Sequence, residues 1–405
     1  MTRTASVLLI LFAFAVPWEY SLDLGEPFGN IARILGLLLL AAAVFSVMEQ
    51  GSLQGPGAVQ WLSLALYLYF ACSYFWTISP EMTLGKIRGY FQVMMIVWLV
   101  WELARAPRDL RSLMRAFVAG CWVLALQTIL SYVAAGPLAE QARYVAEGQD
   151  PNDVARFLDL GFPLAALLFA TEGRRLARFL AIAYVPFGLL AVMLTASRGG
   201  FFGALTALLG SAVLLVLWRP RGASMVFLGL AATVGALWLF VPLESLDRLA
   251  TIPSQLTGGD LNDRVGLWIA GWHAFARSPW LGYGAGTFAA AAGLAAEDTA
   301  HNTVMAMLVT GGLAGTAIFT ATVGAVLWAM ARTRGLLRVA LGTAMAVWVV
   351  TSMVGSVEEN RTTWLIFGMV ALAGRLAIEQ PRSLAYMFAG VETRSKAEAQ
   401  ALAVR

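Results

Sequence analysis

The stretch AHNTVMAMLVTGGLAGT, residues 300–316, contains His301 and Asn302 directly before an apolar run. The run extends to about residue 331, which is long enough for a helix that crosses a bilayer, since crossing takes roughly 20 residues. The whole chain has 2 histidines, His273 and His301. The sequence therefore puts one of its imidazoles at the start of a predicted membrane helix.

The composition extends this interpretation to the rest of the chain. Of its 405 residues 59% are hydrophobic and 13% are charged, and the mean hydropathy is +0.72, whereas soluble proteins carry about 25% charged residues. We therefore predict an integral membrane protein with most of its residues in spans. The net charge of +4 is too small to indicate nucleic-acid binding. The 2 cysteines lie in apolar runs and indicate neither a disulfide framework nor a metal site.

Twelve apolar stretches predict transmembrane helices, and the shortest of them must include flanking residues to reach the length of a span. We interpret the stretch at the N-terminus as a span rather than a removed signal peptide, because no clear small-residue cleavage site follows it. The predicted fold is an all-α integral membrane protein with about 12 transmembrane helices. The stretches are 5–17, 31–48, 58–76, 89–101, 113–135, 154–171, 178–195, 199–218, 224–241, 302–331, 338–356 and 362–378.

Charge differs between alternate linkers and predicts the orientation. One set of linkers holds twelve arginines and three acidic residues, and the other set holds four basic residues and thirteen acidic ones. Because positively charged linkers face the cytoplasm, the acidic set is predicted to face outward and both termini to be cytoplasmic. The basic linkers are 102–115, 172–178, 219–222 and 332–338, and the acidic ones are 18–30, 136–153 and 242–300.

The predicted spans divide the chain into four regions. Residues 1–241 hold the first nine transmembrane helices, and residues 301–378 hold the last three. Between them lies one large outward segment, 242–300, and a polar cytoplasmic tail follows over 379–405. Within the outward segment, DRVGLWIAGWHAFARS (263–278) has apolar residues at helical spacing and predicts an amphipathic helix at the membrane surface.

Two arginines on the predicted outer side are candidates for phosphate binding. Arg198 precedes Gly199 and Gly200 at a predicted helix start, where unpaired backbone amides and the helix dipole favour an anion. Arg264 begins the amphipathic helix. The planar guanidinium can form two parallel hydrogen bonds to one phosphate. The alternatives are that Arg198 reaches toward lipid headgroups and that Arg264 forms a weak local ion pair with Asp263.

Other outward side chains are weaker candidates. His301 can exchange a proton near neutral pH and could act as a general base, although a lone histidine is more often structural. Lys86 and Arg88 could attract an anionic substrate or simply anchor the chain at the interface. The sequence has no HExxH motif, cysteine cluster, DxD motif or Walker loop, so we expect neither a bound metal nor ATP as a substrate.

These motifs together resemble a known family. His301 and Asn302, followed after nine residues by GLAGT (312–316), resemble the signature of O-antigen ligases, the WaaL proteins. Residues 264–288 and SRGG (197–200) resemble the shared core of the O-antigen ligase and polymerase superfamily. DPNDVARFL (150–158) resembles its Asn-Pro-Asn-type segment, with Asp150 at the first position. The resemblance is specific over about residues 195–320.

The resemblance implies a function and a fold. O-antigen ligases have a GT-C-like membrane fold and act in the inner membrane of Gram-negative bacteria. They transfer polysaccharide from undecaprenyl pyrophosphate to a sugar of the lipid A–core oligosaccharide on the periplasmic face. The family uses neither ATP nor metal and is thought to invert the anomeric centre. Its essential arginines resemble Arg198 and Arg264, and its essential histidine resembles His301, with Asn302 a possible orienting residue.

Other functions remain open from the sequence. O-antigen polymerases and protein O-oligosaccharyltransferases belong to the same superfamily and use the same donor. A lipid-linked sugar transporter is an alternative of a different class, but it would need charges within the spans, and these are nearly absent.

Overall fold

The computed structural model describes residues 3–25, 29–136, 143–237, 239–260 and 263–390. All regular elements in these ranges are helices, and no strand occurs in them apart from an isolated bridge between Asp23 and Asn30. The predicted all-α membrane fold is confirmed. The predicted division into four regions stays a prediction, and residues 391–405 of the predicted tail lie outside the described ranges.

Ten helices of the described residues are long and apolar enough to cross a membrane. Each coincides with a stretch predicted from the sequence. Their lengths follow from uninterrupted apolar runs that end at glycine, proline or arginine-rich linkers. They are α1 (Arg3–Ala15, continued by η1, Val16–Ser21), α2 (Ile31–Gln50), α3 (Ala58–Cys72, continued by η2, Ser73–Phe75), α5 (Pro107–Ala135), α6 (Pro151–Thr171), α7 (Arg175–Leu194), α8 (Arg198–Trp218), α14 (Thr303–Arg332), α15 (Gly335–Ser352) and α16 (Arg361–Glu379).

The other two predicted spans are also helices, but they meet the criteria for a span less well. Helix α4 (Pro80–Leu103) has 24 residues, and it begins nine residues before the predicted apolar run because Pro80 and Glu81 favour a helix start. Its first half is polar and includes Lys86 and Arg88. Helix α9 (Ala223–Leu237) is apolar but has only 15 residues, fewer than a span needs.

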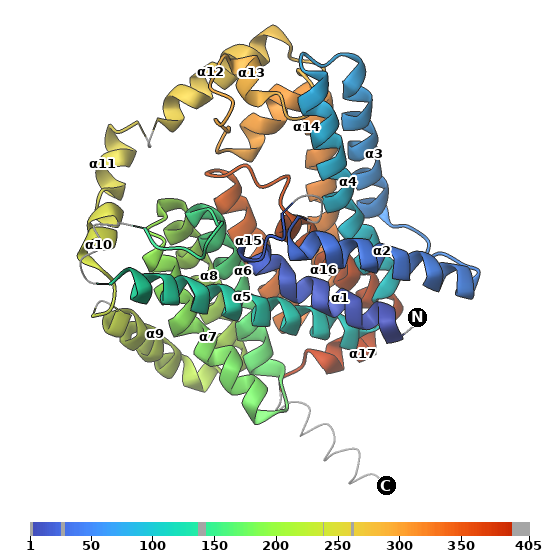
Figure 1. Cartoon of the computed structure of the whole chain (residues 1–405). Helices are drawn as coiled ribbons and strands as arrows, with labels where there is room; N and C mark the ends of the chain where they lie inside the picture. The colour runs from blue at the N-terminus through green and yellow to red at the C-terminus, as the bar shows by residue number, and fades with distance from the viewer. Residues whose placement is uncertain (1–2, 26–28, 137–142, 238, 261–262, 391–405) are drawn as a thin grey trace.

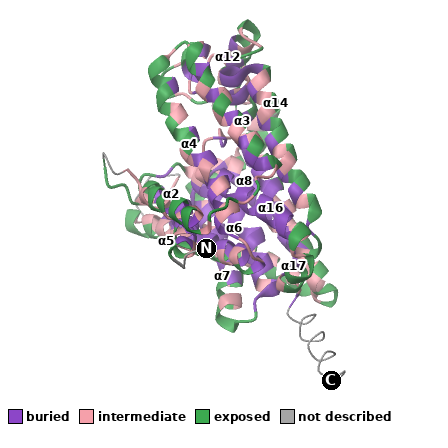
Figure 2. Cartoon of the chain, turned by 90° about the vertical axis from the view of Figure 1, so that its right-hand side faces the viewer, coloured by how far each residue is buried: buried purple, intermediate pink, exposed green. Residues whose placement is uncertain are grey.

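The core of the molecule forms around α6 and α16. Of the apolar window in each helix, 94% is buried for α6 and 83% for α16, against 22% for α2. Helix α6 packs against α7, α8 and α15, whereas α16 packs against α4 and α14. Figure 2 shows the buried residues concentrated around α6, α8 and α16, with exposed residues along α2. These central helices hold the starts of α6 and α8 in place.

Four shorter helices connect α9 to α14: α10 (Leu243–Ala250), α11 (Ile252–Thr257), α12 (Arg264–Arg277) and α13 (Phe288–Ala292). In Figure 1 they follow the edge of the molecule from α9 round to the top of α14. Helix α12 is the amphipathic helix predicted from the sequence. It buries Gly271 and Ala274 toward α13 and α14 and exposes Ile269 and Trp272.

Helix α14 is kinked at Gly312, which has a φ of 59°. The loop after α12 enters this kink, so that Leu313 N donates to Pro279 O at 2.7 Å and Ala314 N donates to Trp280 O at 3.1 Å. A Cβ atom on Gly312 would lie 2.5 Å from Gly282 N. Glycine is required here both by the positive φ and by the close approach of two backbones. The loop and the helix are therefore joined.

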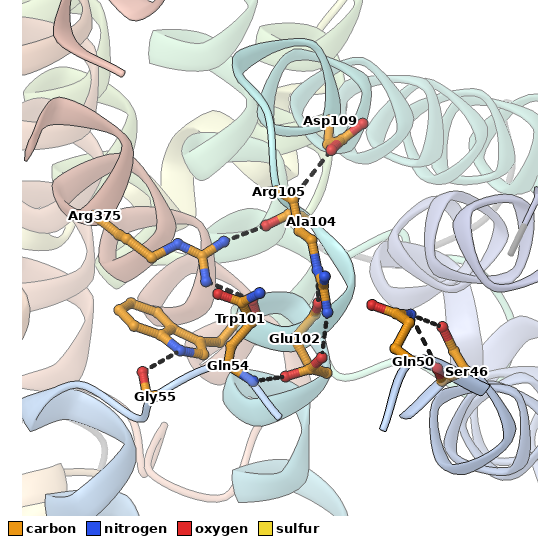
Figure 3. A network of polar contacts seen from close by, with 10 residues as sticks. All are labelled: Ser46, Gln50, Gln54, Gly55, Trp101, Glu102, Ala104, Arg105, Asp109 and Arg375. Atoms are coloured by element: carbon orange, nitrogen blue, oxygen red, sulfur yellow. Dashed lines mark hydrogen bonds and ion pairs between the residues drawn. The ribbon is translucent and has the colours of Figure 1, made fainter. Parts of the chain in front are cut away.

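The end of the molecule away from His301 is held by a polar network (Figure 3). Arg375 on α16 donates to the backbone oxygens of Trp101, at 2.8 Å, and of Ala104, which end α4. Glu102 accepts from Arg105 at 2.6 Å and from Gln54 N at 2.8 Å. The network satisfies carbonyls that the end of a helix leaves unpaired. It fixes the α4–α5 turn to α16 and to the linker after α2. The short helix α17 (Pro381–Met387) follows α16 at this end.

Candidate active site

A cavity of about 140 Å³ lies where the starts of α6, α8 and α12 meet α10 and α11. Four arginines line it, and each comes from a different segment of the chain. We call it the arginine cavity. Its lining residues are Arg143, Asn152, Ala196, Arg198, Gly199, Phe202, Arg248, Ile252, Gln255, Arg264, Trp268 and Val354.

Arg198 is positioned by the turn between α7 and α8. Ser197 caps α8, its hydroxyl accepting from Gly200 N at 3.1 Å. Helix α8 approaches α6 so closely that a Cβ atom on Gly200 would lie 2.3 Å from the Cβ of Ala155. The guanidinium of Arg198 turns toward α10 and α11, where it donates to Thr251 Oγ1 at 2.5 Å. The predicted helix start with an arginine beside it is therefore present.

Arg143 lies in the linker before α6 and was not predicted as a site residue. Its Nε donates to Thr195 O at 3.1 Å, and its Nη2 donates to Asn152 Oδ1 at 3.3 Å. The same oxygen accepts from the Ser197 hydroxyl at 2.8 Å. Burial and the neighbouring Arg248 lower the pKa of Arg143. Asn152 thus joins the start of α6 to the turn that carries Arg198.

Arg248 and Arg264 complete the cluster from the segment between α9 and α14. Burial lowers the pKa of Arg264, as does the positive charge of Arg198. Among the described residues, the buried Nε of Arg248 finds no hydrogen-bond partner. In the part of the chain that the structure describes, Arg143, Arg248 and Arg264 form no ion pair with a carboxylate. Such a cluster suits a ligand with several negative charges.

His301 lies beside the arginine cavity. Trp268, which lines the cavity, donates its indole N–H to the backbone oxygen of Ala300 at 2.9 Å. Burial and the charge of Arg264 lower the pKa of His301, and the nearby carboxylates Asp150, Asp153 and Asp298 oppose this shift. The imidazole is therefore neutral at neutral pH and can accept a proton.

Asn302 fixes the start of α14. Its Oδ1 accepts from Met305 N at 3.0 Å, and its Nδ2 donates to Met353 O at 3.0 Å. The next residue, Val354, lines the arginine cavity. The side chain of Asn302 thus positions the turn that carries His301. A contact of Asn302 with substrate stays a prediction.

Three non-glycine residues with positive φ occur among the described residues: Ala196 (46°), Asp263 (61°) and His301 (43°). Asp263 directly precedes Arg264, and Ala196 lies two residues before Arg198. Such backbone conformations cost about 1–3 kcal/mol each and persist where surrounding contacts hold them. His301 itself therefore has a strained backbone, and Arg198 and Arg264 each follow a strained residue closely.

The two basic residues of α4 lie elsewhere. Lys86 forms an ion pair with Glu359 and packs against Gly286, and Arg88 is exposed. Neither lines the arginine cavity. The role of Lys86 and Arg88 in substrate binding stays a prediction, and it would concern a surface outside the arginine cavity. No group of three histidine, cysteine, aspartate or glutamate residues that could hold a metal occurs in the described ranges.

Sequence reasoning missed Arg143 and Arg248, although a signal for both exists. Each lies in a linker that the charge alternation predicts to face outward, and arginines are rare in such linkers. Arg143 is the one basic residue of linker 136–153. The reasoning that selected Arg198 and Arg264 applies to them equally.

Comparison with known proteins agrees with the sequence resemblance. Residues 183–320 match the model of a protein family described as O-antigen ligase. The matched part runs from α7 into α14 and includes Arg198, Arg248, Arg264 and His301, whereas Arg143 lies before it. No curated protein matches the chain. The match confirms the resemblance to the O-antigen ligase and polymerase superfamily and supports a glycosyltransferase-type enzyme in a multi-pass membrane protein.

Proposed function

We propose that this member of the O-antigen ligase and polymerase superfamily is an O-antigen ligase. It takes a polysaccharide from undecaprenyl pyrophosphate and attaches it to a sugar hydroxyl of the lipid A–core oligosaccharide. The reaction takes place on the periplasmic face of the bacterial inner membrane. The observation that carries this proposal is the convergence of four arginines beside one neutral histidine.

The arginines bind the pyrophosphate of the donor. Two linked phosphates offer oxygens to several guanidinium groups at once, and each fork can form paired hydrogen bonds. Arg198 also lies at the start of α8, where backbone amides and the helix dipole favour an anion. Because Arg143, Arg248 and Arg264 lack carboxylate ion pairs in the described ranges, their charge is available to this ligand.

His301 accepts the proton of the attacking hydroxyl. The oxygen of the acceptor sugar forms a bond to the anomeric carbon as the bond between that carbon and the pyrophosphate oxygen breaks. The proton of the hydroxyl passes to His301, and the electron pair leaves with the lipid pyrophosphate. The arginines stabilise the negative charge that develops there. A single displacement of this kind inverts the anomeric centre. It draws its free energy from the donor and so consumes no ATP, and the arginines supply the charge stabilisation that a metal would otherwise provide.

An apolar cavity of about 680 Å³ between α7, α8 and α9 supports a lipid-linked donor. Its residues on α8 begin at Leu208, ten residues after Arg198. That spacing corresponds to about 15 Å along the helix axis. A prenyl chain whose pyrophosphate is bound at Arg198 can extend along α8 into this cavity.

The test is deletion of the gene followed by analysis of lipopolysaccharide on a gel. Loss of the ligase removes every polysaccharide-capped band while lipid-linked polymer accumulates. A polymerase mutant would instead retain one repeat unit on the core, and a mutant of a protein O-oligosaccharyltransferase would retain the whole ladder. Loss of a transporter would prevent the donor from reaching the outer face of the membrane. Measuring lipid-linked polymer in each leaflet distinguishes this outcome from loss of ligation.

A further inference from the structure

A second basic cavity lies at the end of the molecule away from His301. Its volume is about 480 Å³. It forms where α8, α14 and α16 end, where α15 begins, and where α17 packs against α16. In Figure 1 α17 lies at the opposite end of the molecule from α12. We call it the basal cavity, and its lining includes Leu217 and Trp218 of α8, Arg332 and Arg334 of the α14–α15 turn, and Leu336 of α15.

Two arginines give the basal cavity its charge. Arg332 is the last residue of α14, and its guanidinium carbon lies 5.7 Å from the centre of the Trp328 ring. Arg334 directly precedes α15. In the part of the chain that the structure describes, neither arginine forms an ion pair with a carboxylate, and no acidic residue lines the cavity. Their positive charge is therefore not balanced within these residues.

Arg338, one turn further along α15, differs from these two arginines. Its Nε donates to Thr333 O at 2.5 Å and its Nη2 donates to Ala331 O at 2.6 Å, so it holds the turn between α14 and α15. Helix α15 begins without a side-chain cap, and Gly335 and Leu336 at its start line the basal cavity. The helix dipole favours negative charge at this point, and its effect adds to that of Arg332 and Arg334.

Apolar surface lies directly beside the two arginines. Leu217, which lines the basal cavity, is exposed, and so is Trp328, one turn before Arg332 on α14. Trp218 lines both the basal cavity and the apolar cavity between α7, α8 and α9. Because these residues belong to the last turns of α8 and α14, which are long enough to cross a membrane, the basal cavity lies at the membrane boundary. A ligand there meets positive charge and apolar surface together.

We propose that the basal cavity binds an anionic phospholipid, whose phosphate contacts Arg332 and Arg334 and whose acyl chain lies along Leu217 and Trp218. Guanidinium groups form paired hydrogen bonds with phosphate oxygens. Basic pockets between the cytoplasmic ends of membrane helices bind lipid headgroups, and the charge of linker 332–338 predicts that this end is cytoplasmic. A soluble phosphate compound would use the arginines but not the apolar surface. The proposal does not rest on the proposed transferase function.

The first experiment measures lipid binding by native mass spectrometry of the purified, delipidated protein in detergent. The probes are phosphatidylglycerol and phosphatidylcholine with the same acyl chains. One phosphatidylglycerol should bind more tightly than phosphatidylcholine, because it alone carries a net negative charge. Arg332→Gln/Arg334→Gln should lower the affinity for phosphatidylglycerol roughly 25-fold, since each basic residue beside an anionic lipid contributes about five-fold. Equal affinity of the unchanged protein for the two lipids would overturn the proposal.

The matched control is Arg221→Gln/Arg382→Gln, which removes two exposed arginines at the same end of the molecule that do not line the basal cavity. General attraction of anionic lipid to a basic surface would weaken binding equally in both double variants, and that result overturns the proposal. Thermal unfolding without lipid checks that both are folded. Phosphatidylglycerol should then raise the unfolding midpoint of the control but not that of Arg332→Gln/Arg334→Gln.

The second experiment needs no arginine variant. Glycerol 3-phosphate carries a phosphate without acyl chains, and it should not displace phosphatidylglycerol from the unchanged protein. Displacement would identify a site for a soluble phosphate compound and would overturn the proposal. Binding of phosphatidylglycerol that appears only after removal of residues 391–405 would mean that this segment occupies the cavity, which contradicts the proposal as well.

Discussion

Arginines gather at two ends of the molecule, and the two groups differ in what balances them. At the end away from His301, Arg105 and Arg115 each pair with a glutamate at 2.6 Å. Arg375 at the same end donates to backbone oxygens of the α4–α5 turn. Glutamates and backbone oxygens inside the protein hold these arginines, and the result is a fixed set of helix ends (Figure 3).

The arginine cavity has the opposite character. Arg143, Arg248 and Arg264 form no carboxylate ion pair within the described ranges. Retaining such groups is costly unless something else balances them. The comparison teaches that the surroundings of an arginine, rather than its presence, separate a structural role from a binding role.

The largest expected effect concerns His301, which should matter for turnover and not for binding. His301→Ala should reduce transfer by about 10²–10⁴-fold, the range that general-base catalysis contributes. Binding of the lipid pyrophosphate should persist because the arginines remain. His273→Ala, which changes the exposed histidine of α12, is the control and should transfer normally. If folded His301→Ala binds no donor, the histidine is a phosphate ligand and another group is the base.

Replacing Arg198 or Arg264 should affect both binding and turnover. Loss of a buried charged partner costs about 2–5 kcal/mol, which corresponds to roughly 30- to 5,000-fold in rate. Lysine should substitute poorly because it lacks the planar fork. The measurement is transfer by purified protein at matched concentration, with Arg105→Lys as the control from the other end. Normal transfer by Arg198→Ala would remove that residue from the site.

Arg143→Ala and Arg248→Ala test whether the two arginines missed by sequence reasoning belong to the site. A hydrogen bond to a charged group contributes about 1.5–3 kcal/mol, or roughly 10- to 150-fold in affinity. We expect weaker donor binding in titrations with lipid pyrophosphate, with the thermal midpoint little changed. Unaltered donor affinity in both variants would restrict the site to Arg198 and Arg264.

Arg375→Met should show the reverse pattern. It leaves the carbonyls of Trp101 and Ala104 without their donor, which costs about 1–3 kcal/mol of stability. Thermal unfolding in detergent should therefore shift downward, while the rate per folded molecule stays normal. If Arg375→Met loses turnover but keeps its stability, the contrast between a structural role for Arg375 and a binding role for the arginines of the cavity is wrong.

The smallest effect is the pH dependence of the wild-type protein. The pKa of His301 lies below its ordinary value near 6.5 because of burial and Arg264. The imidazole acts as a base only when neutral, so the midpoint of the acid limb of kcat/KM should lie below pH 6.5. An acid limb above 6.5 would show that His301 is not the group that titrates.

The sequence predicted the membrane helices well because apolar runs depend only on local composition. It also selected Arg198, Arg264 and His301, which the fold brings together through α8, α12 and α14. The outward linker makes Arg143 a candidate from the sequence, but its contact with Asn152 and Thr195 depends on how α6 packs against the turn between α7 and α8. Spacing along the chain carries no information on that distance.

Two glycines of α14 allow close approach. A Cβ atom on Gly315 would lie 2.8 Å from Tyr69 on α3, so the two helices pack closely there. The kink at Gly312 was not predicted. Apolar periodicity indicates where a helix runs but not where a distant loop enters it, and the loop at Gly282 comes from thirty residues earlier in the chain.

That loop joins α12 to the first half of α14. Near the start of α14, Trp268 Nε1 donates a hydrogen bond to Ala300 O, and at the kink Ala314 N donates to Trp280 O. Arg264 begins α12 and His301 precedes α14, so these two bonds hold the arginine and the histidine on one connected unit.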